Sequence, residues 1–309
     1  MEDHFSSIRF LLISALIVMV GVIIASMVGM GIQEESKGMA KPTFLFLWLF
    51  TSTGSLFSFV QFIGFFGPLI GIFLGFDSIN RERVSRTLSK LLSQPIYRDS
   101  VINAKFLAGV AIIAIVLVAI VLIIAGLGIR LIGVVPGAEE VWRLVIYLII
   151  SILYVSFWLG ISILFSVVFR STATSALASL AIWIFFSFFV SLGANAVANA
   201  VAPISESAGS VDMNMAMKNE QIQRTISLFS PMTLYSEATS TILNPMRKAT
   251  KKVFVGPIEQ LSMSRFQSPL PLLQSLYIVI PHLISIVAIT FLCFGVCYLA
   301  FMRQEIRTV

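Results

Sequence analysis

The stretch GPLIGIFLGFDSINRERVSRTLSKLLSQPIYRDSVINAK, residues 67–105, decides how this chain is organised. It begins as an apolar, glycine-rich run and continues as a densely charged segment. The segment carries six cations: Arg81, Arg83, Arg86, Lys90, Arg98 and Lys105. Runs long enough to cross a bilayer flank it on both sides. Because short cation-rich connections stay in the cytoplasm, the sequence places residues 77–105 on the cytoplasmic side of a membrane.

The composition indicates an integral membrane protein. Hydrophobic residues make up 58% of the 309 residues, charged residues make up 12%, and the mean hydropathy is +0.96. Soluble domains are far less apolar. The net charge of +6 comes from cations at the ends of apolar runs, where they set topology, so nucleic acid is not an expected partner.

The fold class predicted from the apolar runs is all-α, a polytopic membrane protein with six transmembrane helices. A bilayer core needs about 20 apolar residues in helical form. The expected spans are residues 10–30, 56–76, 106–129, 141–168, 173–192 and 276–301. The run 44–50 is interfacial, re-entrant or part of a span. Six spans and the distribution of cations predict that both termini lie in the cytoplasm. The expected location is the plasma membrane.

Three parts follow from this layout. Residues 1–194 hold the first five spans with the charged segment 77–105, residues 195–274 form a polar external loop, and residues 275–309 hold the sixth span and a cytoplasmic tail. Within the loop, residues 212–228 lack Gly and Pro and favour a helix.

The second span carries a ridge of glycines three or four residues apart on one helical face: Gly64, Gly67, Gly71 and Gly75. Such spacing lets another helix approach closely. We expect it to serve packing inside one subunit rather than between subunits.

Catalytic signals are poor. The sequence has no P-loop or HExxH motif, and the spans between residues 106 and 192 carry no Asp, Glu or Lys in mid-run. We therefore expect neither an enzyme nor an ion-coupled transporter, and no cofactor bound by this chain. Met213, Met215 and Met217 are weak candidates for a cuprous ion. Apolar packing or contact with the membrane surface is favoured over this, because alternate residues diverge on a helix.

The charged segment resembles the signature region of ABC type-2 permeases, the membrane subunits of ABC exporters. The matching residues are Glu82, Arg83, Thr87, Leu88, Leu91, Leu92, Ser93, Gln94, Pro95, Arg98 and Lys105. Residues 230–245 and 301–307 are also similar to archaeal and bacterial members, including the nitrous-oxide-reductase maturation permeases. The sequence departs from many members at Arg86 and Ser89, where they have glycine and glutamate.

The resemblance implies an exporter of the type V architecture, in which two copies of the permease form a homodimer and a dimer of ABC ATPase subunits binds ATP and magnesium. It implies a coupling helix at residues 77–92 that seats in a groove of the ATPase. The expected coupling residues are Arg81, Glu82, Arg83, Val84, Arg86, Leu88, Leu91 and Leu92.

The expected cargo is hydrophobic or lipid-like, and an external binding protein on residues 195–274 is a further candidate partner. Two alternatives stay open. The chain could be a membrane scaffold or force-transmitting subunit for a copper- or sulfur-linked external partner, or a channel that works without nucleotide.

Overall fold

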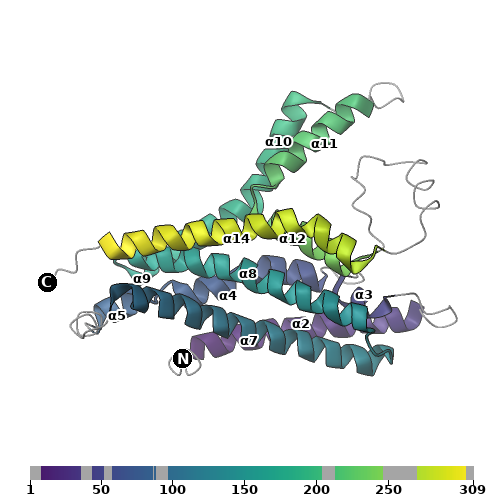
Figure 1. Ribbon diagram of the computed structural model, residues 1–309, viewed down its shortest axis with the longest axis horizontal. Helices are drawn as coiled ribbons and strands as arrows, with labels where there is room; N and C mark the ends of the chain where they lie inside the picture. Colours follow the sequence, from purple (N-terminus) through teal and green to yellow (C-terminus); the bar gives the residue numbers. More distant parts are fainter. Residues whose placement is uncertain are drawn as a thin grey trace.

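The computed structural model describes residues 8–35, 44–51, 58–85, 87, 97–203, 213–245 and 270–303, and the regular structure of these residues is helical, with no strand among them. Long helices run side by side along the longest axis of the molecule (Figure 1). They are α2 (Ile8–Glu35), α4 (Phe59–Gly75), α7 (Arg98–Ile132), α8 (Ala138–Val168), α9 (Thr172–Ile184) and α14 (Leu272–Arg303).

Five helical segments of the described chain are long and apolar enough to cross a membrane: Phe59–Val84, Arg98–Ile132, Ala138–Val168, Thr172–Val201 and Leu272–Arg303. Helix α2 contains a shorter apolar stretch, Ile17–Gly31. The prediction of a polytopic all-α membrane protein is thus confirmed. The exact number of six spans and the layout of the loops stay predictions.

Helix α8 is the centre of the bundle. It packs against α4, α7, α9, α14 and the shorter α12 (Pro231–Leu243). Its large aromatic side chains Tyr147, Tyr154 and Trp158 are fully buried. One end of the bundle, here called the α5 end, holds α5 (Asn80–Val84) and the end of α8. The other, the α3 end, holds α3 (Leu45–Thr51) and the start of α8 (Figure 1).

The glycines of α4 line its contact with neighbouring helices of the same chain. A Cβ atom at Gly71 would lie 2.6 Å from the carbonyl oxygen of Val155, and one at Gly75 would lie 2.8 Å from Cβ of Ser162. Gly67 also faces α8, whereas Gly64 faces Tyr235 on α12. Because glycine has no side chain, the backbones of α4 and α8 can approach closely.

The segment after α9 leaves the bundle. The α-helix changes to a π-helical turn, η1 (Phe185–Phe189), and continues as α10 (Val190–Val201). Helix α11 (Met213–Ser227) packs against α10, and the two project from the bundle as a hairpin (Figure 1). The helix expected at residues 212–228 is therefore present. The expected boundaries at residues 192 and 194 fall inside α10.

Helix α12 returns to the bundle, although the sequence predicts that these residues belong to the external loop. It packs against α14, α8 and α4. Tyr235 is fully buried, stacks on Tyr154 with ring centroids 4.5 Å apart, and hydrogen-bonds with Ser151 over 3.1 Å. This part of residues 195–274 is thus an integral layer of the bundle.

The run 44–50 forms α3, a short helix that packs against α2, α4, α7 and α12. Five of its residues are buried, and Trp48 is 37% exposed. The backbone N–H of Phe46 donates to Oε1 of Glu140 over 3.2 Å, which satisfies one of the amides at the start of α3.

Candidate functional site

The structure describes residues 77–85 and 87 of the expected coupling segment, and helix α5 lies among them. It spans five residues and follows α4 through a turn at residues 76–79. Arg81 and Val84 are exposed, and the exposed fraction of Val84 is 75%. Glu82 and Arg83 are only partly exposed. The helix therefore presents one cation and one apolar side chain outward while two charged side chains turn toward the bundle.

Glu82 ties α5 to the beginning of α7. Oε1 of Glu82 lies 2.6 Å from Nζ of Lys105, and the same ammonium donates to the carbonyl oxygen of Ser78 over 2.8 Å. The two side chains are 30% and 21% exposed, so the pair is partly shielded from water. Lys105 thus fastens both the turn and the helix of this segment.

Arg83 ties α5 to the end of α8. Its Nη2 donates to the carbonyl oxygen of Val167 over 3.3 Å, and its Nη1 donates to that of Phe169 over 3.4 Å. Carbonyl groups at a helix C-terminus lack intrahelical partners and favour a cation. The buried hydroxyl of Ser166 accepts hydrogen bonds from the backbone N–H groups of Ile79 and Asn80, over 3.0 and 3.2 Å.

The structure thus separates the expected coupling residues into two roles. Arg81 and Val84 are on the surface, whereas Glu82 and Arg83 hold the segment to the bundle. Arg86, Leu88, Leu91 and Leu92 lie outside the described residues. Lys105 and Ser166 were missed as partners. In the sequence Lys105 is only a topology signal and, through the resemblance, the entry to the next span, and nothing in the sequence points to Ser166.

Arg143 forms a second polar centre at the α3 end. Its side chain is fully buried. Its Nη1 donates to the carbonyl oxygen of Ile242 over 2.7 Å, and its Nη2 donates to that of Leu270 over 2.7 Å and to Oε1 of Glu139 over 2.8 Å. Its Nη1 also lies 3.3 Å from Oγ of Ser275. One guanidinium therefore joins α8 to the end of α12 and the start of α14.

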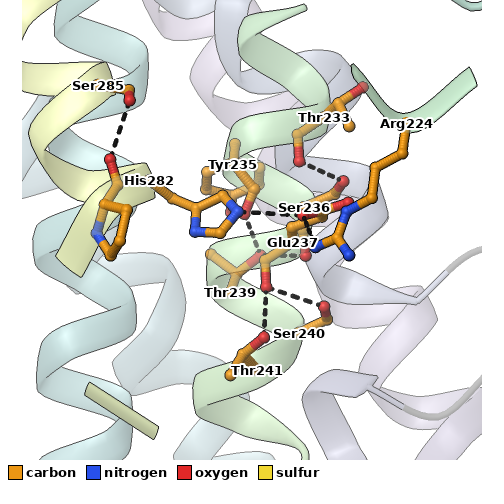
Figure 2. A network of polar contacts seen from close by, with 11 residues as sticks. Arg224, Thr233, Tyr235, Ser236, Glu237, Thr239, Ser240, Thr241, His282 and Ser285 are labelled. Carbon is orange, nitrogen blue, oxygen red and sulfur yellow. Dashed lines mark hydrogen bonds and ion pairs between the residues drawn. The ribbon is translucent and has the colours of Figure 1, made fainter. Parts of the chain in front are cut away.

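A third polar network lies between α11, α12 and α14 (Figure 2). Oε2 of Glu237 lies 3.2 Å from Nη2 of Arg224 and 3.1 Å from Nε2 of His282. The hydrogen bond with His282, together with the charge of Arg224, holds the pKa of Glu237 below its usual value, although burial alone would raise it. Glu237 is therefore a carboxylate at neutral pH and accepts from both neighbours.

The methionine candidates do not converge. They lie on α11, where residues two apart point about 200° away from each other. Met215 is exposed, Met217 is partly buried, and the side chain of Met213 lies outside the described part. Among the described residues, no group of three or more His, Cys, Asp or Glu side chains could hold a metal ion.

The comparison with known proteins gives one family. No curated protein matches the chain. The family model described as ABC-2 family transporter protein matches residues 1–306, nearly the whole chain. Components of this family are membrane subunits, are not themselves catalytic, and generally work with an ABC ATPase. The chain therefore belongs to the ABC-2 family of transporter proteins.

Proposed function

We propose that this chain is the permease subunit of an ATP-driven ABC exporter, and that a separate ATPase dimer docks on residues 77–92. The observation that carries the proposal is the two-sided character of α5. Arg81 and Val84 face outward, where a partner can bind them, while Glu82 and Arg83 are engaged by α7 and α8. A segment built in this way transfers a push on its outer face to two long helices.

A force on α5 would be transmitted through helices and the polar contacts between them. Lys105 links α5 to α7, and Ser166 with Arg83 links it to α8. Helix α8 crosses the bundle to Arg143, whose partners lie on α12 and before and within α14. Movement driven by ATP and magnesium in the partner would thereby shift α8 relative to its neighbours, which is how packed helices pass between two arrangements.

The exposed apolar surface of the fifth span supports contact with a second copy of the chain and with an apolar cargo. Only 11% of the apolar window of Thr172–Val201 is buried within the chain, against 67% for α8. Phe185, Phe188 and Phe189 are exposed. In a membrane, such a surface contacts lipid, another subunit or a hydrophobic molecule. We therefore propose a homodimer that exports a hydrophobic or lipid-like substrate, with an external protein on the 195–274 part as a further candidate partner.

The first experiment tests the docking of the ATPase. The tagged full-length chain is purified from its native membrane as wild type and as Val84→Asp, and the co-purifying proteins are identified. Val135→Asp is the matched control, because Val84 and Val135 are both 75% exposed while Val135 lies in the connection between α7 and α8 at the α3 end. We expect an ABC ATPase with the wild type and with Val135→Asp, and loss of most of it with Val84→Asp.

The second experiment tests transport. The purified complex is reconstituted in vesicles with a fluorescent lipid, with an apolar dye and with cuprous ion, and movement of each is followed with and without ATP. ATP-dependent movement of lipid or dye supports the proposal. Flux without ATPase or ATP would favour the channel, and the absence of any co-purifying ATPase would favour a scaffold. Movement of copper alone would favour a metal-linked cargo like that of the nitrous-oxide-reductase maturation type.

A further inference from the structure

The two helices of the α10–α11 hairpin differ in polarity. Among the described residues of the hairpin, the ionisable side chains all belong to α11: Lys218, Glu220 and Arg224. Helix α10 carries none between Val190 and Val201. Ala194 and Ala198 are fully buried and mark the side of α10 that is covered, because α11 is the helix that packs against it. The hairpin therefore has one side formed by a charged helix and one side formed by an apolar helix.

The side of α10 that points away from α11 is exposed and apolar. On a helix, Ala196 and Ala200 lie about half a turn away from Ala198, and both are exposed. Leu192 and Val197 lie beside them and are 62% and 44% exposed. A Cβ atom at Gly193 would meet nothing within 4 Å. These residues, here called the outer face of α10, are Leu192, Gly193, Ala196, Val197 and Ala200.

The polar side chains of α10 are directed away from this face. Oδ1 of Asn199 accepts a hydrogen bond from Nδ2 of Asn219 on α11 over 3.0 Å, and Oδ1 of Asn195 accepts one from Nε2 of Gln223. Ser191 lies on the same side of the helix as the buried alanines 194 and 198, three and seven residues later. The outer face of α10 thus presents no hydrogen-bonding side chain that would be costly to remove from water.

The length of the fifth span sets the level at which α10 begins. Helix α9 and η1 contain 13 and 5 residues and start at the α5 end, directly after α8. At about 1.5 Å per residue they extend about 27 Å, close to the ~30 Å thickness of a bilayer core. A span that enters the core at the α5 end therefore reaches the opposite boundary of the core where α10 begins.

The hairpin turns α10 toward the level of the membrane and α11 away from it. In Figure 1 the hairpin leaves the bundle sideways, with α10 on the side of the α5 end and α11 on the side of the α3 end. Nη2 of Arg224 on α11 lies 3.2 Å from Oε2 of Glu237 on α12, and α12 packs against α3. Because the bundle crosses the membrane along its length, the outer face of α10 turns back toward lipid, and the charged helix turns toward water.

We propose that the α10–α11 hairpin rests on the membrane at the boundary nearer the α3 end, with the outer face of α10 in contact with lipid and α11 in water. Helical elements with one apolar and one charged side lie in the plane of this boundary, with the apolar side about 5–10 Å into the region of headgroups and acyl chains. Transfer of apolar side chains out of water favours this position. The outer face of α10 also continues the apolar segment Thr172–Val201, so no polar stretch separates it from the span.

The test measures which medium surrounds each side of the hairpin, on the full chain in nanodiscs of phosphatidylcholine and phosphatidylglycerol. Cys293 and Cys297, the two cysteines of the chain, are replaced by Ala, and one spin label is attached at Val197→Cys on α10 or at Gln221→Cys on α11. Collisions of the label with molecular oxygen, which concentrates in lipid, are compared with collisions with a water-soluble nickel chelate. We expect the ratio of oxygen to nickel collisions to be severalfold higher at Val197 than at Gln221.

Two further label positions calibrate the ratio. Phe291→Cys, at an exposed position within α14, is the lipid reference. Val135→Cys, at an exposed position in the connection between α7 and α8, is the water reference. We expect the label at Val197 to approach the lipid reference and the label at Gln221 to approach the water reference. A label at Val197 that favours nickel collisions would place the hairpin clear of the membrane and overturn the proposal. Protection of this label from both reagents would also overturn it, because a second copy or an external protein would then cover the face.

A charge introduced on each side of the hairpin tests whether lipid contact holds it in place. With the label at Ala200→Cys, an exposed position of the outer face, Leu192→Glu should lower the ratio severalfold, because a carboxylate favours water over lipid. Gln221→Glu is the matched control on α11 and should leave the ratio unchanged. An unchanged ratio in Leu192→Glu would contradict the proposal. All of these measurements are made without an ATPase, so their outcome is separate from that of the permease proposal.

Discussion

Lys105 and Glu82 lie 2.6 Å apart, Nζ to Oε1, although 23 residues separate them in the chain. Lys105→Met removes this pair and the bond to the carbonyl oxygen of Ser78. We expect the ATPase to remain bound, because the outward face of α5 is untouched, while cargo-stimulated ATP hydrolysis falls severalfold. ATPase assays on the reconstituted complex with and without cargo measure this.

Glu82→Gln serves as the other arm of a double-mutant cycle. Because the pair is partly exposed, we expect a coupling energy of about 1 kcal/mol or less in thermal unfolding. Strictly additive effects of Glu82→Gln and Lys105→Met on both stability and coupling would show that the contact has no role.

Arg143→Met should be among the most destabilising single changes in this chain. It leaves the carbonyl groups of Ile242 and Leu270 and the carboxylate of Glu139 without their buried partner. Leaving a buried carbonyl group without its donor costs about 1–3 kcal/mol, whereas Glu139 is 43% exposed and can be solvated. Thermal unfolding in detergent measures the loss, and Arg130→Met, at an exposed position of the same end, is the control. Equal melting temperatures for the two variants would contradict the central position of Arg143.

Gly71→Ala tests the close approach of α4 and α8. The added Cβ would lie 2.6 Å from the carbonyl oxygen of Val155, so the helices must separate. We expect a loss of about 1–3 kcal/mol in unfolding free energy, as for other overpacked sites. Gly126→Ala on α7 is the control, because nothing lies within 4 Å of its added Cβ, and it should be neutral or slightly stabilising. If Gly71→Ala leaves the unfolding free energy unchanged, the contact between α4 and α8 can accommodate the added methyl group.

Met215→Leu with Met217→Leu tests the copper interpretation. Because the two side chains diverge on α11, we expect the doubly substituted protein to bind cuprous ion no more weakly than the wild type. A competition titration with a cuprous chelator measures the affinity. If the wild type has a stoichiometric cuprous site that the variant lacks, the methionines are ligands and the prediction is wrong.

The family and the general fold could be predicted because each rests on strong local signals. Apolar runs of membrane length mark the helices, and the ABC-2 resemblance carried by the charged segment is confirmed by the family match over residues 1–306. The end of the fifth span could not be found in the same way. Asn195 and Asn199 indicate an exit from the membrane, yet they bond to Gln223 and Asn219 across the hairpin.

Helix α12 could not be predicted from the sequence because of its composition. Its Ser and Thr residues and its leading Pro231 are typical of a loop, but a proline fits the first turn of a helix. The hydroxyls of Thr239 and Thr241 bond to carbonyl oxygens of their own helix, those of Tyr235 and Glu237, so they can face a packed interior. Hydropathy values alone do not show that these hydroxyl groups are hydrogen-bonded within their own helix.

The site was predicted as a segment but not as a set of contacts. The sequence pattern shows that residues 77–92 are amphipathic and charged, but it does not show which charges turn inward. Glu82 and Arg83 turn inward because Lys105 and the terminal carbonyl groups of α8 lie there, and these are distant in sequence. Contacts of this kind depend on the tertiary fold.

Arg143 also bears on how the protein is made. Its acceptors Ile242 and Leu270, with Ser275, are translated about one hundred residues or more after it. Until they emerge from the ribosome, the partners of the guanidinium among the described residues are Glu139 on its own helix and the ring of Phe44. A charge inside a membrane protein is costly to leave unpaired. A chain interrupted before α14 therefore leaves Arg143 without Ser275, and the addition of α14 supplies this partner.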